Sequence, residues 1–266
     1  MKLGKLIGQG RTAEIYEISK SKVLKLFRPS FPMGASDYEY RIVSKLSNQK
    51  LPIPNAEEVI TVNNRKGIIY ERIYGPTMMQ VIASNPLRMK NEAKRMAELH
   101  RSIQVNIEFD FPSQRIRTAE NIKKTNLLND ELKDALLEKL HLLPNESFLC
   151  HGDFHPDNII VSKDKLWVID WTNATVGDLF SDIARTKILL KYAVLSGHEP
   201  WFMKVLISKV RLKFYNEYFL QYLRLVDGKK HDIDVWEAPV AASRLVELIP
   251  QKEKDLLIER IKKLIE

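Results

Sequence analysis

Residues His151–Asn158 read HGDFHPDN and form the most informative stretch of the chain. They bring two carboxylates, two imidazoles and one carboxamide into eight positions, and Pro156 stiffens the segment that carries them. Taken singly, each of these residue types is common in turns and caps. His151 and His155 with Asp153 form an alternative metal-binding pattern, although His-x-Asp-x-His without a further cluster is a weak metal signal. The meaning of the stretch therefore depends on the sequence around it.

Two spacings connect this stretch to phosphoryl transfer from a nucleotide. Asp153 and Asn158 are five positions apart, which is the Asp-to-Asn spacing of a kinase catalytic loop. Asp170 ends the apolar run Leu166–Ile169 and precedes a turn, which is where a kinase places its metal-binding aspartate. The reaction needs a carboxylate that orients the attacking hydroxyl, and oxygen ligands that hold Mg²⁺ against the phosphates.

A glycine-rich segment near the start of the chain, Gly8–Ile15, reads GQGRTAEI. It matches a kinase glycine-rich loop in which Ala13 stands in place of the third glycine. The missing side chains at Gly8 and Gly10 let the backbone approach phosphates, although Gly-x-Gly also marks ordinary tight turns. A strand pattern follows rather than a helix, which argues against a dinucleotide-binding fingerprint.

Three further features follow this segment in the order that a kinase requires. Lys25 lies in a strand-like run, where a kinase carries the lysine that holds the α- and β-phosphates, and Glu39 follows on a helical pattern where it can pair with Lys25. Taken singly, Lys25 is better interpreted as an edge-strand lysine, and a surface glutamate is the alternative for Glu39. Backbone groups of Glu71 and Ile73, at the end of the fifth predicted strand, could hydrogen-bond adenine.

Residues 1–75 are predicted to be mainly β-structure with one helix. Short apolar or alternating runs separated by turn residues predict hairpins, while Tyr40, Val43 and Leu46 at helical spacing predict a helix between them. The order is three strands, a helix and two strands. Four of the five strand runs lie at 13–18, 22–27, 59–62 and 67–70, with turns at 19–21 and 63–66 and the helix at 36–46.

Helical patterns dominate after Gly75-Pro76. One apolar face recurs at Ala93, Met96, Ala97, His100 and Ile103, and a second helix over 129–143 is stopped by Pro144. Short strand-like runs follow at 148–150, 158–161 and 166–169, with Lys163-Asp164 as a turn. From Asp178 onward the pattern is helical, with breaks predicted at 197–200, Gly228, Pro239 and Pro250.

His151–Ile159 together with Ile169–Trp171 resembles the Brenner-type motif of the aminoglycoside phosphotransferase and choline kinase superfamily. These enzymes are similar to protein kinases in fold but phosphorylate small molecules, and His-Gly-Asp rather than His-Arg-Asp is typical of that branch. Gly177–Ala184 resembles the family's segment after the metal-binding aspartate, so the likeness spans about residues 4 to 185.

The resemblance implies a bilobal, protein kinase-like α+β fold. Residues 1–75 would form the ATP-binding lobe, with a small antiparallel sheet and one helix. This lobe would join, near 71–75, a larger and mainly helical lobe at 76–266 that carries the catalytic loop and the acceptor site. Lys25 would contact the ATP phosphates with Glu39 orienting it. The rest of the nucleotide site would comprise Gly8, Gly10, Glu71 and Ile73.

The resemblance also implies roles within the catalytic loop and after it. Asp153 would act as the catalytic base that orients or deprotonates the substrate hydroxyl, while Asn158 and Asp170 would bind Mg²⁺. Asp182 would support the loop by hydrogen bonding, and His155 would pack within it. Trp171 would either belong to the core or line the acceptor pocket, and we expect it in the pocket.

The acceptor is expected to bind in the helical part, after about residue 185. Aromatic faces there could hold a quaternary ammonium group; they belong to Tyr192, Trp201, Phe202, Phe214, Tyr215, Tyr218, Phe219, Tyr222 and Trp236. The helical spacing of several of them favours core packing for most. An acidic loop could bind ammonium groups or simply be solvated, and the second interpretation is favoured; its residues are Asp227, Asp232, Asp234 and Glu237.

Composition narrows the classes of protein. The chain has 266 residues, a net charge of +8 and a single cysteine, so it cannot form an internal disulfide. Neither a membrane-spanning run nor a signal peptide is recognisable, and a cytoplasmic protein without membrane partners is expected. Residues 1–75 carry 13 Lys and Arg against 7 Asp and Glu, so +6 of the net charge lies there. A polyanionic nucleotide accounts for part of that charge without nucleic acid.

The leading hypothesis is an ATP- and Mg²⁺-dependent kinase that phosphorylates a hydroxyl of a small molecule such as an aminoglycoside, an amino alcohol or a sugar. A nucleotide-binding pseudokinase that serves as an interaction module is the alternative. A basic nucleic-acid-binding protein comes third, because no nucleic-acid motif is recognisable. No oligomeric state is predicted.

Overall fold

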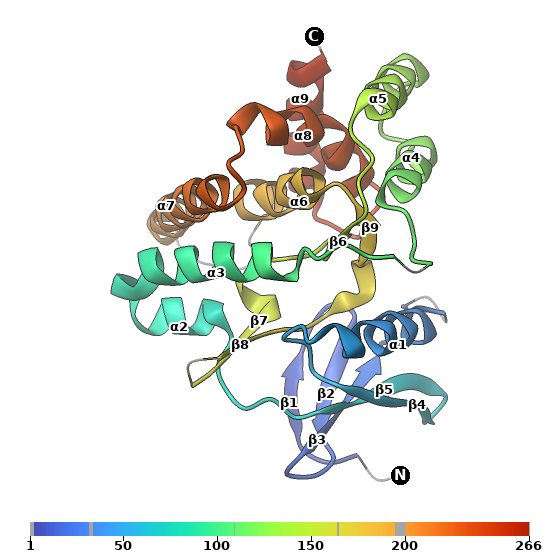
Figure 1. The fold of residues 1–266 in the computed structure, drawn as a ribbon, viewed down its shortest axis with the longest axis vertical. Coiled ribbons are helices and arrows are strands. Elements are labelled where there is room, and N and C mark those ends of the chain that lie inside the picture. The colour runs from blue at the N-terminus through green and yellow to red at the C-terminus, as the bar shows by residue number, and fades with distance from the viewer. Residues whose placement is uncertain (1–2, 32–33, 109, 164, 195–200, 266) are drawn as a thin grey trace. The chain divides into compact units, whose positions relative to one another are not determined.

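The computed structural model describes residues 3–31, 34–108, 110–163, 165–194 and 201–265. The chain divides into two compact units. One comprises Met1–Ser84 with Pro156–Asn173, and the other comprises Asn85–His155 with Ala174–Glu266. Figure 1 shows the elements of both, and each unit is described here by itself.

The first unit contains a five-stranded antiparallel sheet in the order β1-β2-β3-β5-β4. Its strands are β1 Leu6–Gln9, β2 Ala13–Glu17, β3 Lys22–Phe27, β4 Ala56–Val62 and β5 Arg65–Glu71. Side chains alternate along β3, and Leu24 and Leu26 are completely buried on one face of the sheet. This face therefore packs into the hydrophobic core. Gly67 is required opposite them, because a Cβ there would lie 2.8 Å from the carbonyl oxygen of Lys25.

The β4–β5 hairpin turns more tightly than the sequence analysis predicted. Asn63 and Asn64 both adopt positive φ, at 49° and 60°, and alone connect the strands. This matches a two-residue turn whose twist suits a hairpin, a conformation that asparagine tolerates well. The predicted turn at 63–66 was therefore too long, because Arg65 and Lys66 already pair with Val62 and Thr61.

Helix α1, Ala35–Leu46, packs on β4 and β5 in the same unit (Figure 1). Its buried residues recur at helical spacing as Glu39, Ile42, Val43 and Leu46. A glutamate in this otherwise apolar row needs a partner, since a buried charge is costly unless it is paired. The predicted order of three strands, a helix and two strands is confirmed.

Further along the chain, a short segment completes the first unit. It contains the hairpin of β7 Ile159–Ser162 and β8 Lys165–Val168, preceded by the short helix η3 Pro156–Asn158 and followed by η4 Trp171–Asn173. Backbone bonds tie the hairpin to earlier parts of the unit, from Val161 to Pro76 at 2.9 Å and from Val168 to Pro52 at 2.8 Å. Helix α2, Met78–Ser84, packs on this segment.

The second unit is mainly helical, with one small pair of strands. Its elements are α3 Met89–Ile103, α4 Gln114–Lys124, α5 Asp130–Leu142, β6 Phe148–Cys150, β9 Thr175–Gly177, α6 Leu179–Tyr192, α7 Trp201–Val226, α8 Lys230–Arg244 and α9 Gln251–Ile265. The predicted apolar face of α3 is buried throughout, and Asn129 and Asp178 cap α5 and α6 through their side chains. None of the described helices has the length and apolarity to cross a membrane.

Several sequence predictions for this unit can be compared with the structure. Breaks at Gly228 and Pro250 are confirmed, since α7, α8 and α9 are separated there. The break at Pro239 is wrong, because this residue lies inside α8, where it is buried and tertiary packing outweighs the lost backbone hydrogen bond. The break at 197–200 and the turn residue Asp164 lie outside the described residues. The spacing of Tyr215, Tyr218, Phe219 and Tyr222 indicated core packing, and all four are buried.

Candidate active site

Lys25, Glu39 and Asp170 come together in the first unit. The Lys25 ammonium lies 2.7 Å and 2.9 Å from the two carboxylate oxygens of Glu39, and 2.8 Å from Oδ1 of Asp170. Lys25 is 8% exposed and Glu39 is 1% exposed, so the pair is shielded from water. Side chains alternate along β3, so Lys25 points to the sheet face opposite that of Leu24 and Leu26. There it meets Glu39 of α1.

Lys25, Glu39 and Asp170 stabilise one another in their charged forms. Burial alone would lower the pKa of the Lys25 ammonium, but the carboxylates of Asp170 and Glu39 together hold that pKa above its usual value. Tyr70 donates its hydroxyl to Glu39 at 2.9 Å, and burial with the neighbouring Glu39 charge raises the pKa of Tyr70 well above its usual value. The phenol therefore remains a proton donor to the carboxylate.

Asp170 adopts a backbone conformation that is rare outside glycine. Its φ is 64°, and it lies in the two-residue connection between β8 and η4. Such conformations cost energy and occur often at functional sites, where the surroundings hold them in place. Thr172 contributes to this, because its hydroxyl oxygen lies 2.7 Å from Oδ1 of Asp170 and 2.9 Å from Oε2 of Glu39. The sequence analysis did not identify Thr172, since a threonine after DW carries no distinctive local signal.

Asn158 lies in the same unit, at the end of η3 and nearly buried. Its carbonyl oxygen accepts a hydrogen bond from the N–H of Ile169 at 3.0 Å, so the segments that carry Asn158 and Asp170 are joined. The donor set fits Mg²⁺, which binds hard oxygen ligands and in kinases takes one or two protein side chains together with phosphate oxygens. The ammonium on Asp170 shows that this carboxylate already accepts a cation.

Gly8 and Gly10 flank the β1–β2 turn. The N–H of Gly10 donates to the carbonyl oxygen of Ala13 at 2.8 Å, and Arg28 donates to the carbonyl oxygen of Gly10 at 3.0 Å. A Cβ at Gly10 would meet only an oxygen at 3.9 Å, and one at Gly8 only the Ile15 side chain at 3.6 Å. Packing within the described residues therefore does not demand glycine here, whereas close approach of a ligand to the backbone would.

Glu71 ends β5, and its side chain turns toward Asn55. The amide of Asn55 donates to the Glu71 carboxylate at 2.8 Å, and the N–H of Glu71 donates to the Asn55 carbonyl oxygen at 2.9 Å. Arg72 donates its N–H to Ser21 at 2.8 Å. The Glu71 N–H is thus already bonded within the first unit, and contact of the Glu71 and Ile73 backbone with a base stays a prediction.

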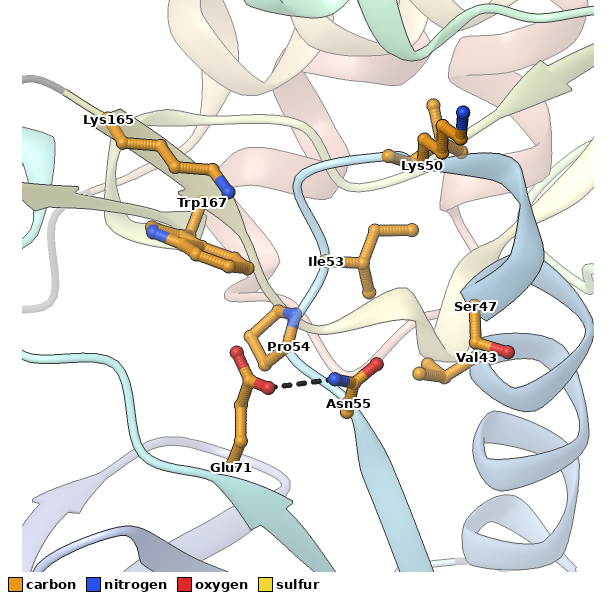
Figure 2. A pocket seen from close by; sticks show the side chains of 10 residues that line it. Val43, Ser47, Lys50, Ile53, Pro54, Asn55, Glu71, Lys165 and Trp167 are labelled. Atoms are coloured by element: carbon orange, nitrogen blue, oxygen red, sulfur yellow. Dashed lines mark hydrogen bonds between the residues drawn. The ribbon is translucent and has the colours of Figure 1, made fainter.

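A cavity of about 240 Å³ lies beside the Asn55–Glu71 pair. Figure 2 shows its lining, with Glu71 and Asn55 facing one another and Lys165 beside Trp167. The Lys165 ammonium lies 3.8 Å from the centre of the Trp167 ring. The Asn55 amide and the Glu71 carboxylate are therefore paired with each other, and the Lys165 ammonium is placed over the Trp167 ring.

Asp153 lies in the second unit, in the loop that follows β6. Its carboxylate is 3.6 Å from Nε2 of His155, and its N–H donates to Nδ1 of His151 at 3.2 Å. Burial alone would raise the pKa of Asp153, but His155, Arg185 and His151 together hold it well below its usual range. His155 therefore does more than pack within the loop, and this contact was not expected from the sequence.

Asp182 holds the loop before Asp153. Its carboxylate accepts the N–H groups of His151 and Gly152, both at 2.8 Å, and lies 2.9 Å from Nε2 of His100. Gly152 has φ of 76°, a conformation that favours glycine. The supporting contact expected for Asp182 is thus present. His100 was recognised only as a member of an apolar helix face, because its partner lies far away in the sequence.

Trp171 was expected in an acceptor pocket, and this is wrong. Its side chain is 1% exposed, and the indole N–H donates to the carbonyl oxygen of Val168 at 3.1 Å. The ring therefore belongs to the core of the first unit. A tryptophan with a satisfied indole N–H is a stable core residue, and its position after Asp170 contained no information on which way the ring points.

The acidic loop of the sequence analysis is also wrong, because Asp232, Asp234 and Glu237 lie on α8. Asp232 caps this helix by accepting the N–H of Lys229. Asp234 and Glu237 bind the buried ammonium of Lys187, at 2.5 Å and 2.6 Å. Helix formation on either side of Gly228 turned these carboxylates toward α6, so internal cations already neutralise Asp234 and Glu237.

Glu237→Gln is expected to lower the free energy of unfolding by about 3–5 kcal/mol at neutral pH, because it leaves the Lys187 ammonium poorly compensated in the core. Lys187 and Arg260 lower the pKa of Glu237 to about 2, even though burial opposes this. The stabilisation is present above the pKa of the unfolded chain, about 4.3, and is lost as the pH falls toward 2. Urea unfolding at several pH values should show the two proteins converging below about pH 4.

The matched control is Glu259→Gln, which removes an exposed partner of Lys263. It should leave the free energy of unfolding nearly unchanged at every pH, because solvent screens an exposed pair. A constant difference between wild type and Glu237→Gln across the acid range would contradict the proposed pairing.

The fold, the Lys25–Glu39–Asp170 cluster and the loop that carries Asp153 together define a class of protein. An antiparallel sheet that carries a buried Lys–Glu pair, followed by a mainly helical part, is the protein kinase-like α+β fold expected from the sequence. A sequence model of the phosphotransferase enzyme family matches residues 4–192. The chain belongs to this family.

Relatives support the same class. The Protein LicA homolog of Metamycoplasma hominis is 30% identical over 132 residues, which cover 47% of this chain and 51% of that protein. The match therefore spans about half the length of this curated relative. Aminoglycoside phosphotransferase APH(4)-Ia is similar in structure, with a TM-score of 0.69 and 15% identity over 98% of this chain and 92% of that chain.

A choline/ethanolamine kinase family protein from Mesorhizobium loti is also similar, with a TM-score of 0.59 and 14% identity over 98% of this chain and 87% of that chain. A thermostable mutant of APH(4)-Ia was solved as a ternary complex with AMP-PNP and hygromycin B. That structure has a TM-score of 0.67 and 14% identity over 98% of this chain and 92% of that chain. At these identities the likeness shows the fold.

Proposed function

We propose that the protein is an ATP- and Mg²⁺-dependent kinase that transfers the γ-phosphoryl group to a hydroxyl of a small molecule. The observation that carries this proposal is the buried Lys25–Glu39 pair whose ammonium also reaches Asp170. A purely structural ion pair would not need a third, partly exposed carboxylate in a rare backbone conformation. In a kinase, this arrangement holds phosphates and metal.

The first unit would bind the nucleotide. Lys25 would hold the α- and β-phosphates while Glu39 keeps its ammonium in place, and the backbone at Gly8 and Gly10 would cover the phosphates. Backbone groups of Glu71 and Ile73 would hydrogen-bond adenine. In this proposal residues 1–75 form the nucleotide-binding lobe, and residues 76–266 form the lobe that carries the catalytic loop and acceptor.

Asp170 and Asn158 would hold Mg²⁺ through oxygen atoms. When bound, the ion supplies positive charge that neutralises the phosphate oxygens as the transition state forms. For Asp170 to take this role, the Lys25 ammonium must exchange its bond to Oδ1 of Asp170 for the phosphates, while its two bonds to Glu39 remain. Thr172 would keep Asp170 and Glu39 aligned during that exchange.

Asp153 would orient the acceptor hydroxyl and receive its proton. The hydroxyl oxygen forms a bond to the γ-phosphorus, the bond from that phosphorus to the β,γ-bridging oxygen breaks, and ADP leaves with the electron pair. Because the pKa of Asp153 is held well below its usual range, its carboxylate is ionised at neutral pH but is a weak base. Orientation of the hydroxyl is therefore its main contribution, in keeping with a loose transition state.

The acceptor class in this proposal is a hydroxyl-bearing small molecule: an aminoglycoside, an amino alcohol or a sugar. The similar structures include an enzyme solved with hygromycin B and a choline/ethanolamine kinase family protein, which supports this range. Recognition of a cationic acceptor by Asp234 and Glu237 is not part of the proposal, because Lys187 binds both. The single buried cysteine, Cys150, supports a cytoplasmic location.

The test is an ADP-release screen with Mg·ATP across aminoglycosides, macrolides, choline, thiamine, homoserine, fructosamines and simple sugars. We expect one class to raise ADP release far above the acceptor-free rate, with a phosphorylated product detected by mass spectrometry. Mg·ATP binding without turnover on any acceptor, and without slow ATP hydrolysis, would favour the pseudokinase alternative instead.

A further inference from the structure

Side chains of one helix hold the peptide groups around Asp153. In α6, Asp182 accepts the N–H of Gly152 at 2.8 Å, while Arg185 donates Nε–H to the carbonyl oxygen of Gly152 at 3.0 Å. Both polar groups of the Gly152 backbone are therefore bound by side chains one helical turn apart. Thr186 adds a hydrogen bond to the carbonyl oxygen of Phe154 at 3.0 Å. Asp153 sits between these two held carbonyl groups.

Arg185 is itself held from its other end. Its Nη2 lies 2.6 Å from Oε1 of Glu247, which belongs to the connection between α8 and α9. Oε2 of Glu247 accepts from Arg244 at 2.7 Å, and Arg244 binds Glu253 at 2.7 Å and 2.8 Å. Glu253 also accepts the N–H of Val194, just after α6, at 3.1 Å. Four alternating charges thus run from the loop to α9.

The four charged side chains differ in how far they are buried. Arg244 and Glu253 are almost fully buried and compensate each other, and Arg185 is 9% exposed, whereas a third of the Glu247 side chain is exposed. A buried guanidinium with one carbonyl and one carboxylate partner has little freedom to choose another position. Glu247 therefore determines where the Arg185 guanidinium lies, and the guanidinium in turn determines where the Gly152 carbonyl lies.

Glu247 lies outside the part of the chain that matches the family. The family match covers residues 4–192, which includes Asp153, Asp182 and Arg185, while Glu247, Arg244 and Glu253 lie beyond it. The catalytic-loop motif alone therefore does not account for the contacts that hold it. Arg185 follows directly after the segment Gly177–Ala184 that resembles the family, and it lies in a run of buried positions on α6.

We propose that Arg185 is a positioning residue for Asp153, and that Glu247 is the anchor through which the C-terminal part of the chain aligns the catalytic loop. This inference rests on the proposed function, because alignment matters for the rate only if Asp153 acts on a hydroxyl. Displacement of a catalytic group by about 1 Å can lower a rate by about 100-fold, so a lost anchor far from the reacting atoms has a measurable effect.

The kinetic test uses Arg185→Met, Arg185→Lys, Glu247→Gln and the double variant Arg185→Met/Glu247→Gln. Arg185→Met should lower kcat about 30- to 100-fold with KM for ATP within about 2-fold, because the nucleotide contacts are elsewhere. Arg185→Lys should recover part of the loss, since it keeps a cationic donor. Glu247→Gln should have an intermediate effect that disappears in the Arg185→Met background, because both act through one contact.

The matched control is Arg211→Met. Arg211 is also a partly buried arginine, but it lies on α7 and donates to the carbonyl oxygens of Leu189, Leu190 and Ala193 at the C-terminal end of α6. It should lower thermal stability while leaving kcat within about 2-fold. Equal kcat losses for Arg185→Met and Arg211→Met, or independent effects of Arg185→Met and Glu247→Gln, would overturn the positioning role.

A second measurement does not depend on catalysis. Hydrogen exchange of the amides in His151–Asn158 should become at least about 10-fold faster in Arg185→Met and Glu247→Gln, with little change there in Arg211→Met. If the wild type showed no turnover on any acceptor but these exchange rates changed as expected, the proposed function would fail while the anchoring contact stood. Unchanged exchange in Arg185→Met would overturn the anchoring contact itself.

Discussion

Asp153→Asn is expected to lower kcat by about 10²–10⁴-fold while KM for ATP changes little. Asparagine has nearly the same shape, so the backbone bonds that Asp182 and Arg185 make to Gly152 should persist. What disappears is the negative charge that, in the proposed mechanism, would orient the acceptor hydroxyl and take its proton. Steady-state ADP release and calorimetric ADP binding measure the two parts separately.

The control for this variant is Asp157→Asn, which changes an exposed carboxylate of the same motif. It should keep kcat within about 2-fold, since no role in the reaction is assigned to it. Turnover of Asp153→Asn within about 3-fold of wild type would remove Asp153 from the mechanism, and a matching loss in Asp157→Asn would indicate a general effect on the loop.

Lys25→Met is expected to lower kcat/KM for ATP by about 10²–10³-fold and also to destabilise the protein. In the proposed site the phosphates would lose their cation, and the carboxylates of Glu39 and Asp170 lose the ammonium that lies between them. Removing one partner of a buried ion pair costs about 3–5 kcal/mol, because the other charge stays buried. Initial rates at varied ATP and urea unfolding measure the two effects.

A double variant separates stability from nucleotide binding. Adding Glu39→Gln to Lys25→Met removes the uncompensated charge and should recover much of the stability without restoring kcat/KM. Lys22→Met is the control on the same strand, where the lysine is exposed and pairs with Glu57. It should change stability by less than about 1 kcal/mol. Normal ATP kinetics in a folded Lys25→Met/Glu39→Gln protein would contradict the assigned role of Lys25.

Local patterns predicted the elements of the first unit well. Alternation and turn residues indicated its strands, and helical spacing indicated α1. The errors came where two local signals competed. Asn63 and Asn64 close the β4–β5 turn by themselves, although Arg65 and Lys66 also read as turn residues, because the strand pairing extends the ladder to them.

Errors in the second unit have a different cause. Pro239 lies inside α8, and Asp234 and Glu237 lie on that helix rather than in a loop. A proline and several carboxylates are local signals for a break, but the buried Lys187 ammonium on α6 compensates the carboxylates. No local pattern could have indicated that partner, since it lies about 50 residues earlier in the chain.

The sequence by itself determined which residues are candidates for the chemistry, because spacing and residue type are local properties. These are Asp153 in its loop, Asn158 and Asp170 as the proposed metal ligands, and the lysine and glutamate predicted to pair. Only the tertiary structure decided which charges meet. Lys25 and Asp170 are 145 residues apart, and Arg185 reaches Glu247 beyond the matched family region. Such contacts depend on how elements pack, since a buried ion must be paired by whatever residue the fold brings to it.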